Sequence, residues 1–181
     1  LIPGGGGTKE MALRASDAYY DGDIELPRLK EYFLNIGQAK VSTSGQEAFD
    51  LGYLRNGVDS ISVNTEKLIQ DAKEKVILLD NLGYTKPIKR NNIKVLGNQA
   101  LGMFLVGADS FKEGNYITEH EKLMSEKLAY VLCGGNLSSP TFVSEQYLLD
   151  LEREAFLSLC SEAKTLERIK YMLEKGKPLR N

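Results

Sequence analysis

The sequence is poor in the residues that build metal centres and disulfide frameworks. It contains 1 histidine, which excludes the common metal sites built from several histidines. Its 2 cysteines, Cys133 and Cys160, lie far apart and neither belongs to a Cys-x-x-Cys pair, so we expect no disulfide framework and no structural zinc site. We predict inert core packing for both, in a reducing cytoplasm, because they lie among apolar helical residues.

Long apolar runs and an excess of one charge are also absent. Crossing a bilayer takes about 20 apolar residues, and the longest runs here are short stretches such as 76–79 and 103–106. Lys and Arg number 23 and Asp and Glu number 25, which gives a formal net charge of −2. A membrane span and a basic nucleic-acid-binding surface are therefore disfavoured, and the length of 181 residues suits one hydrophobic core.

The opening of the chain is unusual, because it has no methionine and runs from Leu1-Ile2-Pro3 into four glycines. Four consecutive glycines are entropically costly to order. We therefore interpret this opening as the interior of a domain, in which a loop delivers backbone amides to a ligand or to a neighbouring strand. On this interpretation, residues upstream of Leu1 are missing.

Helical periodicity and capping signals dominate the rest of the sequence. Helical apolar spacing with suitable start and stop residues predicts helices over 8–18, 27–36, 44 to either 52 or 57, 65–82, 93–111, 118–132, 144–159 and 163–175. The expected N-caps are Thr8, Ser44, Thr118 and Ser144. Within 65–82, an apolar stripe is expected to form one buried face, made of Leu68, Ala72, Val76 and Leu79.

Strand signals are scarce. Only residues 60–63 alternate apolar and polar side chains as a strand does. The segments 85–92 and 136–143 contain proline and turn-forming residues and are expected to be connections. The sequence thus predicts a mainly α fold with seven or eight helices and about one short strand.

The sharpest local feature is the glycine run that leads directly into the first predicted helix, Pro3-Gly4-Gly5-Gly6-Gly7-Thr8. Free amides and the positive end of a helix dipole would receive an oxyanion or a phosphate there. The run is not a Walker loop, because Gly-x-x-x-x-Gly-Lys-Ser/Thr is absent. The alternative is a tight strand-to-helix turn in which glycine only permits close packing.

The other polar residues give weaker signals. His120, at a helix start beside Glu119 and Glu121, is expected to be a solvated polar residue. The acid-rich helical runs have lysine or arginine nearby, which is typical of a solvated face, and no catalytic acid–base pair is evident. The basic residues of 171–180 either complement the end of a helix dipole or clamp a phosphate.

Two separated stretches resemble crotonase-type enoyl-CoA hydratases. Residues 1–9 resemble the Ile-Pro-Gly-x-Gly-Gly-Thr segment of that family, and residues 152–156 with 173–178 resemble its terminal helices. Residues 44–54 and 60–82 are similar to a helix and to a strand followed by a helix in the same family. The resemblance is strongest to the bacterial 3-hydroxyacyl-CoA dehydrogenase/enoyl-CoA hydratase fusions of fatty-acid β-oxidation, whose chains end in a similar Gly-Lys-Pro-Leu-Arg-Asn.

For the fold, this resemblance implies the helical C-terminal portion of a crotonase-like α/β-spiral domain. Residues 1–84 would be the C-terminal part of the crotonase-like core, 85–143 a helical insertion and 144–181 a C-terminal helical cap. The parent would be an enzyme that takes an acyl-CoA substrate, with NAD in its dehydrogenase part. The segment alone is expected to be inactive.

For the site, the resemblance implies that the Gly4 amide lies near the reacting water and acyl group. The catalytic glutamates and the oxyanion-hole amides belong to upstream segments that this chain does not contain. Phe156 and Lys175 match positions that contact the adenine and phosphate of CoA, often across a subunit boundary in a homo-oligomer. Gly176 departs from the family, whose stand-alone members usually carry a basic residue there, and this weakens the expected phosphate contact.

A free-standing helical protein-interaction module is the alternative to this hypothesis. In that case the glycine run would be a flexible start and the basic end only a helix stop. An exposed apolar patch would favour a part of a larger domain over a complete module.

Overall fold

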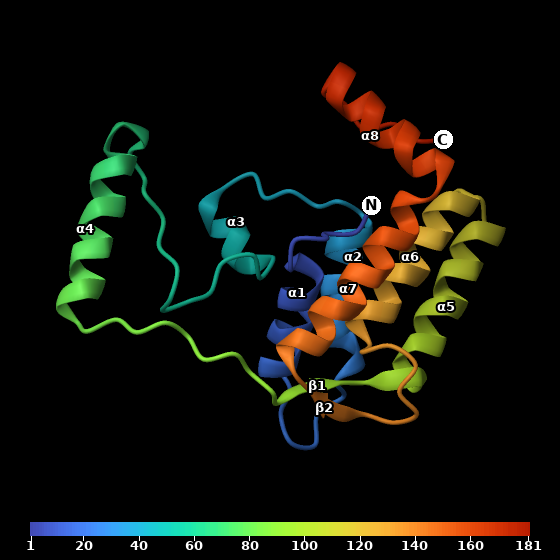
Figure 1. The fold of residues 1–181 in the computed structure, drawn as a ribbon, viewed down its shortest axis with the longest axis horizontal. Coiled ribbons are helices and arrows are strands. Elements are labelled where there is room, and N and C mark those ends of the chain that lie inside the picture. The colour runs from blue at the N-terminus through green and yellow to red at the C-terminus, as the bar shows by residue number, and fades with distance from the viewer. The chain divides into compact units, whose positions relative to one another are not determined.

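Eight α-helices, a single turn of 3₁₀ helix and two short strands make up the computed structural model, which describes all 181 residues (Figure 1). The prediction of a mainly α fold is therefore confirmed. The chain divides into unit 1, residues 1–40 and 90–181, and unit 2, residues 41–89. The resemblance to a family predicts a different division, into 1–84, 85–143 and 144–181. That division rests on the similarity of sequences and not on contacts within the chain, so it stays a prediction.

Unit 1 is a helical bundle with a two-stranded sheet at one end (Figure 1). Helix α6 packs against α1, α2, α5 and α7, and α8 contacts α7. The elements of unit 1 are α1 (Gly7–Asp17), α2 (Leu26–Gly37), β1 (Ile93–Val95), α5 (Gly97–Glu113), α6 (Glu119–Leu132), β2 (Thr141–Val143), α7 (Glu145–Cys160) and α8 (Ala163–Lys175).

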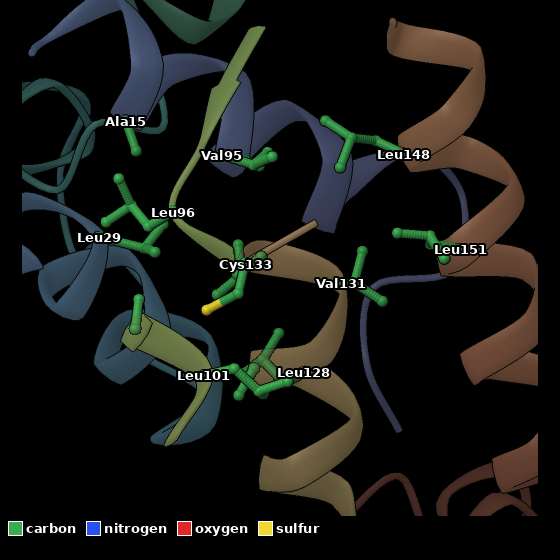
Figure 2. Close-up of a cluster of buried hydrophobic side chains, with 14 of the residues drawn as sticks. Ala15, Leu29, Val95, Leu96, Leu101, Leu128, Val131, Cys133, Leu148 and Leu151 are labelled. Carbon is green, nitrogen blue, oxygen red and sulfur yellow. The ribbon is translucent and has the colours of Figure 1, made fainter. Parts of the chain in front are cut away.

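The core of unit 1 draws side chains from almost every one of its elements. Figure 2 shows Val131 and Cys133 from the end of α6, with Leu29 of α2, Val95 of β1 and Leu148 of α7 in the same cluster. All five are at most 2% exposed. Burying an aliphatic side chain of this kind stabilises a fold by about 1.5–3 kcal/mol, so this cluster fixes how the helices pack.

The sheet lies where the sequence predicts no strand. β1 and β2 pair antiparallel, with Ile93 opposite Val143 and Val95 opposite Thr141. The helix predicted from residue 93 therefore begins only at Gly97, and the predicted loop 136–143 ends in a strand. The strand predicted over 60–63 is wrong, because those residues have no partner strand to complete a ladder of hydrogen bonds.

Most predicted helix ends in unit 1 are confirmed by their caps. Thr118 and Glu121 form the complete capping box of α6, and the Ser144 hydroxyl accepts a hydrogen bond from the Tyr147 amide at the start of α7. Gly176, with φ of 63°, ends α8 where predicted. Thr8 is the exception, because Gly6 caps α1 and Thr8 lies inside the first turn, where its hydroxyl donates to the Pro3 carbonyl at 3.1 Å.

Unit 2 contains α3 (Gly45–Asp50), the 3₁₀ turn η1 (Thr65–Lys67) and α4 (Leu68–Asn81). The predicted cap of α3 is confirmed, since the Ser44 side chain accepts a hydrogen bond from the Glu47 amide at 3.1 Å. The Glu47 carboxylate binds Thr43 instead of closing a capping box on Ser44. Close packing of Ile61 on Gly45 joins α3 to the following loop.

Helix α4 forms as predicted but buries no residue. Leu68 is 54% and Val76 is 65% exposed, and Leu79 is only half-buried. The prediction of a buried apolar face is therefore wrong for this structure. Periodicity in a sequence reports which face of a helix is apolar, whereas burial needs a partner surface, and unit 2 supplies none for α4.

Candidate functional site

The glycine run forms a tight loop that turns into α1. Gly6, with φ of 95°, occupies the left-handed region that favours glycine and is the N-cap of the helix. The chain closes back on itself where the Thr8 amide and hydroxyl both donate to the Pro3 carbonyl. Gly4 and Gly5 are exposed, and the structure gives neither of their amide nitrogens a hydrogen-bond partner.

A buried carboxylate from α7 holds the inner side of this loop. Glu152 is 1% exposed, and its two carboxylate oxygens accept hydrogen bonds from the amides of Gly6 at 2.5 Å and Lys9 at 2.8 Å. These amides belong to the N-terminal end of α1, where helix donors lack partners within the helix and the dipole favours a negative charge. The protein itself therefore supplies the anion at this helix end.

This arrangement corrects the prediction that the start of the first helix receives an external oxyanion or phosphate. The amides of Gly6 and Lys9 are already bonded to Glu152. The amides without a partner are those of Gly4 and Gly5, on the exposed side of the loop, and that of the half-buried Gly7. The tight-turn alternative therefore describes the inner half of the run, whereas the exposed outer half keeps both of its amides free.

The sequence did contain a signal for Glu152. On α7 the buried residues Leu148, Leu151, Ala155 and Leu159 recur with helical spacing, and Glu152 stands within this apolar stripe. A charged residue at such a position is rarely buried unless it has a partner. The partner lies 143 to 146 residues earlier in the chain, so its identity required the tertiary structure.

Lys9 connects α1 to α7 a second time. Its side chain lies 3.3 Å from the carboxylate of Glu145, which also accepts a hydrogen bond from the Arg90 amide at 2.8 Å. The hydrogen bond from Arg90, and then the bond and charge of Lys9, lower the pKa of the Glu145 carboxyl despite its partial burial. Glu145 therefore stays ionised, and it joins the strand-side loop to α1.

The three residues implied by the resemblance occupy different surroundings. Gly4 lies on the exposed side of the glycine loop, and the Phe156 ring packs against it from α7. Lys175 is the exposed last residue of α8. A helix of 13 residues is about 20 Å long, so Lys175 lies far from the start of α8. The structure thus packs Phe156 on Gly4, whereas Lys175 stands at the far end of α8.

His120 is buried rather than solvated, which corrects the prediction for this residue. It is 5% exposed, and its Nε2 lies 3.0 Å from the hydroxyl of Thr165, which is itself 1% exposed. Burial, followed by the positive charge of Arg168, lowers the pKa of the imidazole. A neutral histidine paired with a threonine joins the start of α6 to the start of α8.

The two cysteines are free, as predicted, but only one is fully buried. Cys133 is 0% exposed and burial raises the pKa of its thiol to about 12, which confirms inert core packing. Cys160, at the end of α7, is half-buried.

Surface hollows in unit 1 are open and shallow. One of them, about 360 Å³ in volume, lies beside His120 and is bordered mainly by charged side chains of α6 and of the start of α8. No group of three or more His, Cys, Asp or Glu side chains lies close enough to hold a metal ion. None of the helices is both long enough and apolar enough to span a bilayer.

Comparisons with known proteins yield a relative along the whole chain. No family model matches the sequence, and no solved structure matches it. A Bacillus subtilis (strain 168) protein named "Probable 3-hydroxyacyl-CoA dehydrogenase" is 44% identical over 181 residues, which is 100% of this chain and 22% of the relative. The chain is thus homologous to a segment of that protein and spans about a fifth of its length.

Proposed function

We propose that this chain is the C-terminal part of a crotonase-type enoyl-CoA hydratase domain, within a longer cytoplasmic enzyme of fatty-acid β-oxidation that is also a 3-hydroxyacyl-CoA dehydrogenase. The observation that carries the proposal is the 44% identity to the probable dehydrogenase along all of this chain. A span of 22% of that relative fits a part of a larger catalytic assembly.

The two activities belong together chemically. Adding water across the double bond of a trans-2-enoyl-CoA gives a 3-hydroxyacyl-CoA, which is the substrate of a 3-hydroxyacyl-CoA dehydrogenase. A segment that resembles a hydratase is therefore consistent with a relative named as a dehydrogenase. In the parent, two carboxylates upstream of this chain would act as general acid and base in the hydration.

In this reaction the chain would contribute the glycine loop. The exposed Gly4 amide, which has no hydrogen-bond partner in the structure, is suited to donate to the reacting water or the acyl group. Backbone donors held in a rigid loop need no reorganisation as charge develops, and this is the source of their catalytic effect. The loop is a supporting element of the site, because the acid–base groups lie elsewhere in the parent.

Contacts with CoA are proposed for Lys175 and Phe156, and the two residues fit this role unequally. The exposed ammonium of Lys175 is free to approach a phosphate as a point charge. Phe156 is half-buried, and one edge of its ring is already packed on Gly4, so less of the ring remains for an adenine. NAD would bind outside this chain, whose strands form an antiparallel pair and no parallel βαβ unit.

One observation, the exposed apolar surface of α4, bears on the alternative of a helical protein-interaction module, and by itself it favours a part of a larger domain over a complete module. Helix α4 exposes apolar side chains along its length, including Ile69, Val76 and Leu78. An apolar surface of this kind needs a partner. On the alternative hypothesis, a separate protein would cover this surface of α4. On the proposed one, the remainder of the enzyme would cover it.

Hydration of crotonyl-CoA by the full-length protein tests the proposal. We expect activity in the full-length protein and none in residues 1–181 alone, together with weaker CoA binding by calorimetry after Lys175→Ala. Lys170→Ala is the matched control, because Lys170 is also an exposed lysine of α8. A full-length protein with neither hydratase activity nor CoA affinity would contradict the proposal and leave the interaction module as the working hypothesis.

A further inference from the structure

Helix α7 contacts the glycine loop with two side chains that lie one helical turn apart. Glu152 accepts hydrogen bonds from the Gly6 and Lys9 amides. Phe156, four residues further along α7, places its ring against Gly4. Positions i and i+4 share one face of a helix, so a single face of α7 contacts both the start of the loop and its junction with α1.

The Glu152 contact is stronger than an ordinary turn hydrogen bond. A carboxylate that accepts from backbone amides forms charge-assisted bonds, and these are about twice as strong as bonds between neutral groups. Because Glu152 is 1% exposed, losing its partners would leave a desolvated charge. The loop and α7 are therefore strongly coupled, although they lie at opposite ends of the chain.

The geometry also separates two pairs of amides in the loop. Those of Gly6 and Lys9 point inward to Glu152, whereas those of Gly4 and Gly5 are on the exposed side without partners. Four successive glycines have many alternative backbone conformations of similar energy. The hydrogen bonds to the inner amides and the packing of the Phe156 ring on Gly4 select one of these conformations. The selected conformation sets the direction of the amides of Gly4 and Gly5.

We propose that Glu152 and Phe156 are positioning residues, which set the glycine loop so that the Gly4 amide faces the reacting groups. This inference rests on the proposed hydratase function, in which Gly4 borders the active site. Neither side chain touches the substrate in this role. In this role Phe156 acts through its contact with Gly4, apart from any contact of the remaining ring with adenine.

Kinetics of the full-length protein with crotonyl-CoA test this role through the variant Glu152→Gln. The amide side chain keeps the size of glutamate and one acceptor oxygen, but its NH₂ group cannot accept from the second backbone amide. Misplacing the Gly4 donor should lower kcat by about 10- to 100-fold and change KM by less than about three-fold. Glu154→Gln is the matched control, because Glu154 lies on the same helix and is exposed, and it should leave both parameters unchanged.

Hydrogen exchange of the same variants, measured by mass spectrometry on peptides that cover residues 4–10, separates positioning from loss of folding. Exchange in these peptides should be about ten-fold faster in Glu152→Gln than in Glu154→Gln, while exchange in α6 stays unchanged. Phe156→Ala is the second variant, which removes the ring without touching either hydrogen bond. It should lower kcat in the same way.

Each outcome bears on a different claim. An active wild-type protein whose kcat is unchanged in both Glu152→Gln and Phe156→Ala would overturn the positioning role and leave the hydratase proposal intact. Unchanged exchange at residues 4–10 in Glu152→Gln would overturn it as well, because the contact would then not hold the loop. A wild-type protein without hydratase activity would refute the proposed function, and the positioning role would fall with it.

Discussion

The ring of Phe156 lies directly against the backbone of Gly4. A β-carbon built on Gly4 would be 2.2 Å from Cδ2 of the ring, far inside van der Waals contact. At Gly5, the next residue, a β-carbon would meet nothing within 4 Å. The first of these glycines is thus required by close packing against a residue 152 positions later, whereas the second is not.

This contrast predicts different effects of the same substitution at neighbouring positions. Gly4→Ala should lower the free energy of unfolding by about 1–3 kcal/mol, because the ring or the loop must move. Gly5→Ala should change it by less than about 0.5 kcal/mol. Urea denaturation measures both.

The pair also predicts a coupling that one double variant reveals. In a Phe156→Ala background the ring is gone, so Gly4→Ala should cost less than it does in the wild type. Equal costs of Gly4→Ala in the two backgrounds would show that the ring does not press on this glycine.

The core and α4 should respond differently to the loss of an apolar side chain. Leu148 is 0% exposed in the core of unit 1, and Leu148→Ala should cost about 2–5 kcal/mol. Leu78 of α4 is 50% exposed, and Leu78→Ala should cost less than about 0.5 kcal/mol in the 181-residue chain. Both are measured by urea denaturation.

The same α4 substitution also bears on the proposed function. If the rest of a longer enzyme covers α4, Leu78→Ala should cost more in the full-length protein than in the 181-residue chain, because the side chain is then buried. If Leu78→Ala had the same small effect on the stability of both proteins, the rest of the longer enzyme would not pack on α4.

Thiol labelling should distinguish the two cysteines. Burial raises the pKa of Cys133 to about 12, so almost none of its thiolate is present at neutral or mildly alkaline pH. A maleimide should therefore modify the half-buried Cys160 first and reach Cys133 only on unfolding. Rapid modification of Cys133 in the native protein, read by mass spectrometry, would contradict the core placement.

The stability of the fold should fall in mild acid because of His120. Burial and the charge of Arg168 lower its pKa in the folded state from the usual 6.5, with the Leu1 amino group and Lys164 acting in the same direction and Glu162 opposing them. Well above pH 6.5 the imidazole is neutral in both states. As the pH falls below that value, the unfolded chain binds the proton first, so the free energy of unfolding decreases.

His120→Gln provides the control for this pH effect. Glutamine does not titrate, so the loss of stability between about pH 7.5 and about pH 5.5 should be smaller in the variant than in the wild type. Urea midpoints at the two pH values give the comparison. An equal loss in both proteins would assign the acid sensitivity to other groups.

Much of the helical structure could be predicted from local sequence. Thr118 and Ser144 cap their helices as predicted, and α8 occupies the predicted residues up to Gly176. Capping and termination depend on hydrogen bonds between residues a few positions apart. These interactions join residues that are close in the sequence, so they form independently of how the rest of the chain packs.

Part of the candidate site was also within reach of the sequence. The glycine run before a helix indicated a loop with available amides, and the exposed Gly4 does keep an amide without a partner. The charge of Glu152 within an apolar stripe of α7 is a signal that this residue has a buried partner. Its target could not be deduced, because Gly6 and Lys9 are distant in sequence and a carboxylate suits any buried donor.

The sequence by itself determined most of the helical elements, the caps Ser44, Thr118 and Ser144, and the free state of both cysteines, because these depend on neighbouring residues and on composition. Only the tertiary structure decided that Ile93–Val95 pairs with Thr141–Val143 and that His120 is buried against Thr165. It likewise decided that the carboxylate of Glu152 takes the amides at the start of α1. Each of these three interactions joins residues that are far apart in the sequence. A local pattern indicates that a buried polar group or a strand needs a partner, but it does not identify that partner.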